Sequence, residues 1–215
     1  GLAKLGPVDV ISVGPAVPPA PVAGVRHYEH IAKDGVKSGL QRLWKKRWVF
    51  DAAAHPMVSG HYQESVVEAI KSRFETVSYD VAVVEELHLA RYLMDLKRGL
   101  CQTIFDAHNL ESSLSGDMAA TQCENGNFGK WKRVFLDRQL VAAEKHYASA
   151  SNRVWACSTL DQEGFEKLIG SSPRVDVIPN SIDVHAYAQA DRYHEADDWR
   201  DEPLFVAGAP RVASL

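Results

Sequence analysis

The stretch that decides the fold covers residues 79–114, with the sequence YDVAVVEELHLARYLMDLKRGLCQTIFDAHNLESSL. Its two short apolar runs, 81–84 and 103–105, are separated by a segment in which apolar residues recur at helical spacing. This order predicts a strand, a helix and a second strand parallel to the first. Polar residues follow both runs, and ligands of open parallel sheets bind beyond the carboxyl ends of the strands. We therefore look for a site at these two strand ends.

Length and composition place the chain among globular proteins. Its 215 residues, 46% of them hydrophobic, suffice for one large domain or one domain with part of another. The formal charge of -4 gives no overall reason to expect a nucleic-acid partner. Three distant cysteines without a CxxC pair favour a reducing, cytoplasmic compartment. No apolar run approaches the ~20 residues of a membrane span, so any membrane contact is expected to be peripheral, at the inner face of the plasma membrane.

Strand and helix patterns alternate along the rest of the chain. Further strands are predicted at residues 8–13, 154–157, 175–178 and 204–207, and helices at 62–74, 131–148 and after 158–161. Residues 158–161 are close to a capping box, in which Ser158 caps the helix that follows. This alternation predicts an α/β fold with a Rossmann-like parallel sheet and helices on both faces. The proline-rich segment 14–23 and the glycine-containing segment 116–129 are expected to be loops.

His108 is the first candidate for the site. It follows the predicted strand at 103–105, where an imidazole can donate a hydrogen bond to a sugar hydroxyl or a phosphate oxygen. A structural role is the alternative, in which His108 caps the adjoining helix or bonds to Asp106. Position alone does not decide between these two roles.

Two glutamates and an asparagine complete the candidates. Glu85 and Glu86 end the strand at 81–84 and should point to opposite sides. We expect one of them to face the cleft and Glu86 to cap the helix that follows. Asn109 is suited to cap the helix that begins after it.

Basic residues alternate with tryptophan in the segment 37–50. The residues concerned are Trp44, Lys45, Lys46, Arg47 and Trp48. Indoles that lie at the headgroup level and cations that attract anionic lipid are typical of an interfacial helix. An amphipathic helix with its tryptophans in the protein core is the alternative.

Motifs of several common enzyme classes are absent from the sequence. It has no GxGxxG after a strand, no GxxxxGK[ST] and no GxSxG. The histidine pairs at 27 and 30 and at 55 and 61 lack the clustered acids or cysteines that would complete a metal shell. The sequence therefore predicts no metal site.

Three segments carry a resemblance to a known family. FDAHNLESSL at 105–114, VWACSTLDQEGFEKL at 154–168 and VDVIPNSIDVHAY at 175–187 resemble, in order and spacing, the N-terminal half of bacterial glycosyltransferases of family 4. Members commonly show a strand ending in D-x-H-N, a strand ending in Ser before a helix with an early acid, and a P-N-G-[IV]-D segment. The similarity covers most of residues 1–187, and IPNSID at 178–183 is its most specific piece.

The resemblance implies a GT-B fold, in which two Rossmann-like domains face each other across a cleft. The first domain would hold a glycan or lipid-linked acceptor and the second a nucleotide sugar, for retaining sugar transfer in polysaccharide biosynthesis, without an essential metal or other cofactor. His108 matches the family's cleft histidine, which would contact the donor sugar or the developing charge on the leaving phosphate. Glu85 and Asn109 are assigned to substrate binding. Asn180 and Asp183 match the segment before the interdomain connection and are carried over as structural or hinge residues.

The chain departs from the family pattern at both ends. The family's first strand would lie before Gly1, so residues 1–188 are expected to form an incomplete acceptor-side domain. Residues 189–215 would be a linker and the first strand of a missing nucleotide-sugar domain, and Ser181 replaces the usual Gly. Loss of the central first strand would leave two inner strands without a hydrogen-bond partner, unless residues 204–207 or another chain filled the gap.

Two other function classes stay open. The same cleft suits a non-catalytic Rossmann-like module that binds a nucleotide or a sugar. A peripheral membrane adaptor built on the segment 44–48 is compatible with the glycosyltransferase hypothesis. Under the glycosyltransferase hypothesis, the 215-residue chain alone should transfer no sugar, because most of the donor site would belong to the second domain.

Overall fold

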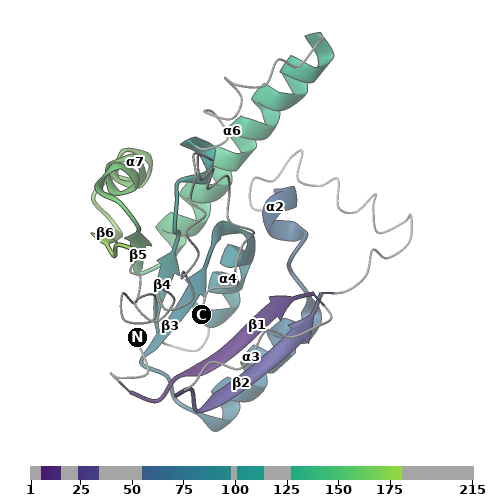
Figure 1. Cartoon of the computed structure of the whole chain (residues 1–215), viewed down its shortest axis with the longest axis vertical. Helices are drawn as coiled ribbons and strands as arrows, with labels where there is room; N and C mark the ends of the chain where they lie inside the picture. Colours follow the sequence, from purple (N-terminus) through teal and green to yellow (C-terminus); the bar gives the residue numbers. More distant parts are fainter. Residues whose placement is uncertain (1–5, 16–23, 34–54, 98–100, 114–126, 181–215) are drawn as a thin grey trace, which may run out of the picture.

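The strands form two separate parallel sheets (Figure 1). The computed structural model describes residues 6–15, 24–33, 55–97, 101–113 and 127–180. In the first sheet, β1 (Asp9–Gly14) pairs with β2 (His27–Ala32). The second sheet has the order β3 (Val81–Glu85), β4 (Gln102–Asp106), β5 (Arg153–Ala156) and β6 (Arg174–Val177). All neighbouring strands are parallel, which confirms the predicted α/β class.

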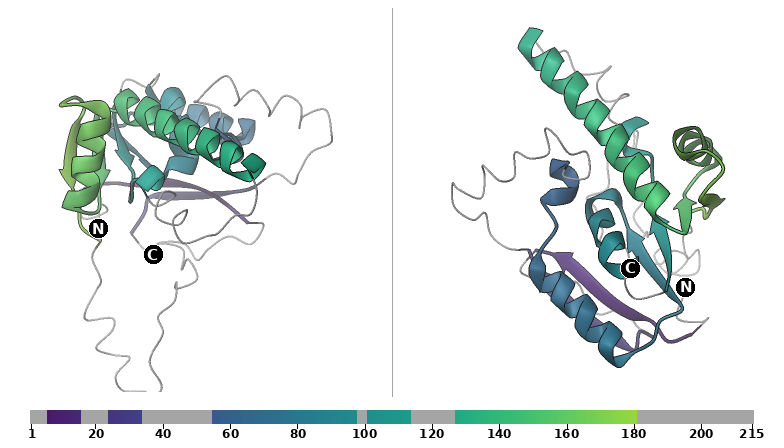
Figure 2. Two further views of the ribbon diagram at one scale, coloured as in Figure 1. Left: turned by 90° about the horizontal axis from the view of Figure 1, so that it is seen from above. Right: turned by 180° about the vertical axis from the view of Figure 1, so that it is seen from behind.

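Helices connect the strands and cover one side of them. They are α2 (Pro56–Ser59), α3 (Glu64–Thr76), the 3-10 helix η4 (Leu87–Tyr92), α4 (Leu93–Leu96), α6 (Asn127–Ala150) and α7 (Thr159–Ile169). The two views of Figure 2 show α3, α4 and α6 on one side of the strands. Helices on the second face stay a prediction. None of the described helices is long and apolar enough to cross a bilayer.

The core lies between the four-stranded sheet and these helices. Side chains alternate along parallel strands, so one face of β3 to β6 is buried against the helices. The buried side chains of this face are Val84, Thr103, Phe105, Val154, Ala156 and Val175. Phe105 contacts Phe165 of α7 edge to face, with ring centroids 6.4 Å apart. The opposite face is more polar, and there Asp176 pairs with Arg153 at 2.9 Å and Arg174 at 2.6 Å.

β1 and β3 are each paired along one edge only among the described strands. β1 pairs with β2 and β3 pairs with β4, and no described strand lies between β1 and β3. Residues 204–207, which the sequence analysis considers as one filler of such a gap, lie outside the described residues. The two sheets are instead connected by side chains at the amino ends of these strands.

Asp9 makes this connection. Its carboxylate, 5% exposed, accepts two hydrogen bonds from the Arg26 guanidinium, at 2.7 and 2.9 Å. It also accepts one from the Tyr79 hydroxyl at 2.5 Å and one from Arg73 at the end of α3. Arg26, together with Tyr79 and Arg73, keeps the pKa of Asp9 well below its usual range despite its burial. We call these four residues the Asp9 hub.

Most predicted elements are present with bounds shifted by one or two residues, but β2 was missed. Its sequence, HYEHIA, alternates polar and apolar residues without an apolar run. The prediction of a loop at 116–129 is wrong at its end, because α6 already begins at Asn127. The predicted helix after Glu86 begins as a 3-10 helix. The segment 44–48, Asp183 and residues 189–215 lie outside the described residues.

Candidate functional site

The carboxyl ends of β3 and β4 bring two carboxylates side by side. Glu85 and Asp106 are register partners, so their side chains leave the sheet on the same face. The ladder continues past the strands, because the backbone N–H of Glu86 donates to the Asp106 carbonyl at 2.8 Å. The Ala107 N–H likewise donates to the Trp155 carbonyl at 2.9 Å. The turns that follow both strands therefore start from fixed positions.

Both turns contain a residue with unfavourable backbone geometry. Among the described residues, Glu86 and His108 are the two non-glycine residues with positive φ, at 63° and 54°. Glu86 combines this φ with a ψ of 149°, a region that essentially only glycine occupies. Such conformations cost about 1–3 kcal/mol and cluster at binding and catalytic sites. Two of them at the ends of neighbouring strands mark this edge as the candidate site.

Desolvation and like charge affect the acids at this edge. Desolvation raises the pKa of Glu85, although the residue as a whole is exposed, and Asp106 raises it further while His108 lowers it. Burial also raises the pKa of Asp106, while His108 acts in the opposite direction. Glu85 and Asp106 therefore hold a proton more readily than isolated carboxylates do. The pair can accept hydrogen bonds from hydroxyl groups or retain a proton.

His108 lies next to this pair. Its Nε2 is 3.8 Å from Asp106 Oδ2, and the two side chains are 30% and 26% exposed. The Asp106 carboxylate can orient the imidazole while leaving it accessible to a ligand. The structural alternative, in which His108 bonds to Asp106, is present only as a contact, because 3.8 Å is too long for a hydrogen bond. The geometry is compatible with both roles.

Two carboxylates from other helices bind the backbone after His108. We call residues 107–112 the His108 turn. The backbone N–H of Leu110 donates to Asp161 Oδ1 of α7 at 3.1 Å, and that of Ser112 donates to Glu144 Oε1 of α6 at 3.2 Å. The expectation that Asn109 caps the following helix is therefore wrong. Its Oδ1 instead accepts a weak hydrogen bond from the Cys157 thiol at 3.5 Å.

α7 packs closely against the same turn. Ser158 caps α7, as predicted, by accepting the Asp161 N–H at 3.1 Å. The Asp161 carboxylate then binds Leu110 and the Ser158 hydroxyl. A Cβ added to Gly164 would lie 2.7 Å from Leu110 Cδ2, so a side chain at 164 would require the Leu110 side chain to shift. The position of His108 is thus fixed from behind by α7.

Glu144 is a functional candidate that sequence reasoning missed. It lies within the helical pattern 131–148 among other charged residues, and nothing in the sequence distinguishes it. Its side chain is 1% exposed, and among the described residues its Oε2 has no hydrogen-bond partner. Burial raises its pKa to about 7, although the hydrogen bonds from Ser112 oppose this. This carboxyl group changes protonation near neutral pH directly behind the His108 turn.

Glu86 belongs to a different set of contacts from the one predicted. It does not cap η4 with its side chain, and its carboxylate instead pairs with His88 Nδ1 at 2.8 Å. The His88 ring lies 4.6 Å from the His61 ring, centroid to centroid. Lys33, directly after β2, contacts His61 Nε2 at 3.0 Å.

The remaining predicted residue within the structure is Asn180. It is exposed just after β6, where the Ile178 N–H still donates to the Ala156 carbonyl at 2.8 Å. Its assignment as a structural residue stays a prediction. Among the described residues, no three His, Cys, Asp or Glu side chains are grouped so as to hold a metal ion.

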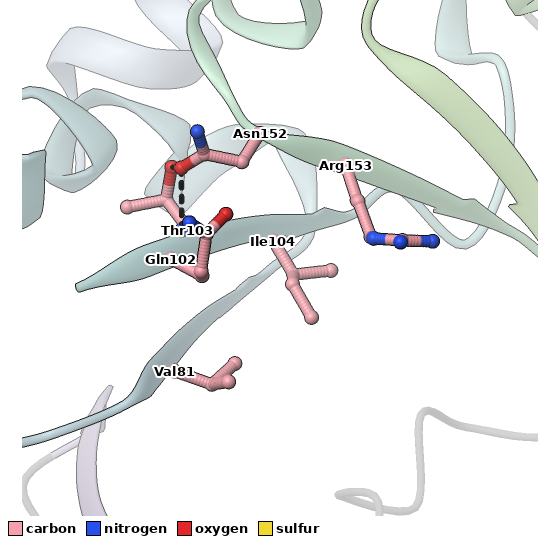
Figure 3. Close-up of a pocket in the computed structure, with 6 residues that line it drawn as sticks. All are labelled: Val81, Gln102, Thr103, Ile104, Asn152 and Arg153. Atoms are coloured by element: carbon pink, nitrogen blue, oxygen red, sulfur yellow. Dashed lines mark hydrogen bonds between the residues drawn. The ribbon is translucent and has the colours of Figure 1, made fainter.

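A cavity of about 220 Å³ lies away from this edge, near the amino ends of β3, β4 and β5 (Figure 3). It is lined by Val81, Gln102, Thr103, Ile104, Asn152 and Arg153. Asn152 Oδ1 accepts hydrogen bonds from the Thr103 N–H and hydroxyl at 2.8 and 2.9 Å, so both polar groups are satisfied. The cavity brings no acid or histidine together and is not our candidate site.

Comparison of the chain with family models, with curated proteins and with solved structures gave no significant match in any of the three.

Proposed function

We propose that this chain forms the acceptor-side domain of a cytoplasmic, retaining glycosyltransferase that uses a nucleotide-sugar donor. The observation that carries the proposal is the pair of strained residues, Glu86 and His108, beside the Glu85 and Asp106 carboxyl groups. Ligands of parallel sheets bind at this edge. The sequence resemblance described above supports the choice of reaction.

In this proposal each group has a separate task. His108 donates a hydrogen bond to the donor sugar or to a phosphate oxygen as negative charge develops on the leaving group. Asp106 orients the imidazole from 3.8 Å. Glu85 accepts a hydrogen bond from an acceptor hydroxyl. A second domain would supply the contacts to the nucleotide, and no essential metal or other cofactor is part of the proposal.

Sugar transfer by the product of the complete reading frame tests this proposal. It should be measured with a panel of labelled nucleotide sugars and an acceptor extract. We expect His108→Ala to lower kcat at least 100-fold, in line with the loss of a group that stabilises transition-state charge. His146→Ala is the control, because His146 is an exposed histidine of α6. Equal transfer by His108→Ala and the unchanged protein would refute the catalytic role.

A non-catalytic sugar- or nucleotide-binding module is the second candidate. It is favoured by the partners that the motif residues already have within the chain, His108 with Asp106 and Asn109 with Cys157. Titration of the 215-residue chain with nucleotide sugars, followed by NMR of the histidine side chains, separates the two. Saturable shifts of His108 without any turnover by the complete protein would favour the module.

A further inference from the structure

A group of charged and titratable side chains lies at the carboxyl edge on the side of β2. It consists of Lys33 after β2, His61 between α2 and α3, and His88 of η4, with Glu86 behind His88. These residues come from three segments that are far apart in the sequence. The sequence offered no sign of this group, because its members share no motif and no common spacing.

The hydrogen bonds define how His61 is protonated. Its Nδ1 contacts the Met57 carbonyl at 3.1 Å, and a carbonyl can only accept, so Nδ1 carries the proton. Its Nε2, 3.0 Å from the Lys33 ammonium, must then be the acceptor. Burial lowers the pKa of His61, and the charges of Lys33 and His88 lower it further, while Glu86 opposes them. The ring is therefore neutral, with a lone pair directed at a cation.

In the part of the chain that the structure describes, no acid pairs with Lys33. Glu86, the carboxylate of this group, pairs with His88 instead, at 2.8 Å. The Lys33 side chain is exposed, and His61 takes up only one of its three N–H groups. An ammonium without an acid partner among the described residues, beside two imidazoles at the edge where ligands bind, is suited to a multiply charged anion.

We propose that Lys33, His61 and His88 form a binding site for a phosphoryl anion, either a phosphate monoester or a pyrophosphate. Lys33 donates to the anion, and His61 takes up a proton at Nε2 from solvent and donates from the same atom. The bond between Lys33 and His61 is exchanged for two bonds to phosphoryl oxygens. As a subsite for a phosphate group on the acceptor this assignment rests on the proposed function, whereas anion binding itself does not.

Calorimetric titration of the 215-residue chain with inorganic pyrophosphate tests the site. We expect binding that strengthens from pH 8 to pH 6, with proton uptake measured in two buffers of different ionisation enthalpy. Lys33→Met should weaken binding roughly tenfold or more, as expected for a lost charge-assisted hydrogen bond. Lys71→Met, at an exposed lysine of α3, is the matched control and should bind like the unchanged chain. His61→Gln should bind weakly and should lose the strengthening toward pH 6.

Sedimentation with vesicles distinguishes the source of the phosphoryl group. Binding to phosphatidylcholine vesicles only when they contain phosphatidic acid, and only with Lys33 intact, would assign the site to a lipid headgroup. Pyrophosphate binding without vesicle binding would assign it to a soluble ligand. Undetectable pyrophosphate binding, or equal affinity of Lys33→Met and the unchanged chain, would overturn the proposal. Binding that persists when His108→Ala abolishes sugar transfer would separate this site from the proposed catalytic function.

Discussion

Two nearly buried carboxylates at opposite ends of the strands have opposite surroundings. Asp9, 5% exposed, is surrounded at the amino ends by two guanidinium groups and a phenol, which keep its pKa low. Glu144, 1% exposed, lies behind the His108 turn with one oxygen that no described residue binds, and burial raises its pKa to about 7. The amino ends therefore hold a fixed charge that connects the sheets. The carboxyl edge holds groups that titrate and a strained backbone.

Of the substitutions proposed to test this contrast, replacement of Glu144 should have the largest effect on the free energy of unfolding and its dependence on pH. Its pKa is raised by burial from 4.5 to about 7, so the folded chain binds this proton more tightly than the unfolded chain. The free energy of unfolding should therefore fall as pH rises through this range, by about 3 kcal/mol from this group. Urea unfolding of Glu144→Gln at pH 5 and at pH 8 measures this contribution. The difference in the free energy of unfolding between the two pH values should be smaller than in the unchanged chain by about 3 kcal/mol.

The matched control for Glu144 is Glu68→Gln, at an exposed glutamate of α3. It should keep the pH dependence of the unchanged chain. If the free energy of unfolding of Glu144→Gln depended on pH as that of the unchanged chain does, Glu144 would be ionised in the folded chain at pH 5. The contrast with Asp9 would then fail.

Breaking the Asp9 hub should change the free energy of unfolding by less than replacing Glu144 does. Its dependence on pH should run in the opposite direction. Asp9→Asn removes a carboxylate that accepts from Arg26, Arg73 and Tyr79, and should cost about 2 kcal/mol after allowance for the exposed part of the arginines. Because the folded pKa is depressed, this contribution is present above the usual value of 3.8 and is lost as pH falls below it. Hydrogen exchange should show β1 and β2 losing protection before β3 to β6. Asp80→Asn, at an exposed residue, is the control, and equal exchange in the two variants would contradict the role of the hub.

Relieving strain at Glu86 should stabilise the chain. Its φ of 63° and ψ of 149° suit glycine, so Glu86→Gly removes about 1–3 kcal/mol of strain against an entropic cost of about 1 kcal/mol. Loss of the pair with His88, which is partly exposed, should subtract little. We expect the free energy of unfolding, measured by thermal unfolding, to rise by about 1 kcal/mol. A lower melting temperature for Glu86→Gly would show that the strain estimate, or the small value of the pair, is wrong.

The smallest change in the free energy of unfolding is expected when an ion pair on the surface of α7 is removed. Lys167 and Glu163 form an i,i+4 pair at 3.9 Å, with side chains 79% and 63% exposed. Such pairs contribute about 0.3–0.5 kcal/mol. Lys167→Ala should therefore unfold within about 0.5 kcal/mol of the unchanged chain. A loss as large as that of Asp9→Asn would mean that burial does not distinguish the two ion pairs.

The sequence predicted the elements that contain apolar runs. β3 and β4 were found because buried parallel strands are nearly continuous apolar stretches, and Ser158 was found because capping is a local pattern. β2 was missed because its strand character depends on pairing with β1 rather than on its own composition. Pairing of this kind is a property of the fold, which local patterns do not contain.

The candidate site was predicted in part for the same reason. Glu85 and His108 could be placed at strand ends from the apolar runs that precede them. The roles of Glu86 and Asn109 could not, because they depend on His88 and Cys157, whose positions follow from packing. Asp9, with partners 17, 64 and 70 residues away, is the extreme case.

The close approach of Gly164 to Leu110 has a consequence for variation among related sequences. A Cβ at position 164 would lie 2.7 Å from Leu110 Cδ2, and Leu110 is only 8% exposed and cannot easily turn away. A larger residue at 164 should therefore be tolerated only together with a smaller one at 110. In an alignment these two positions should covary, although 54 residues separate them. Homologues that keep Gly164 and Leu110 should also keep the His108 turn in this position.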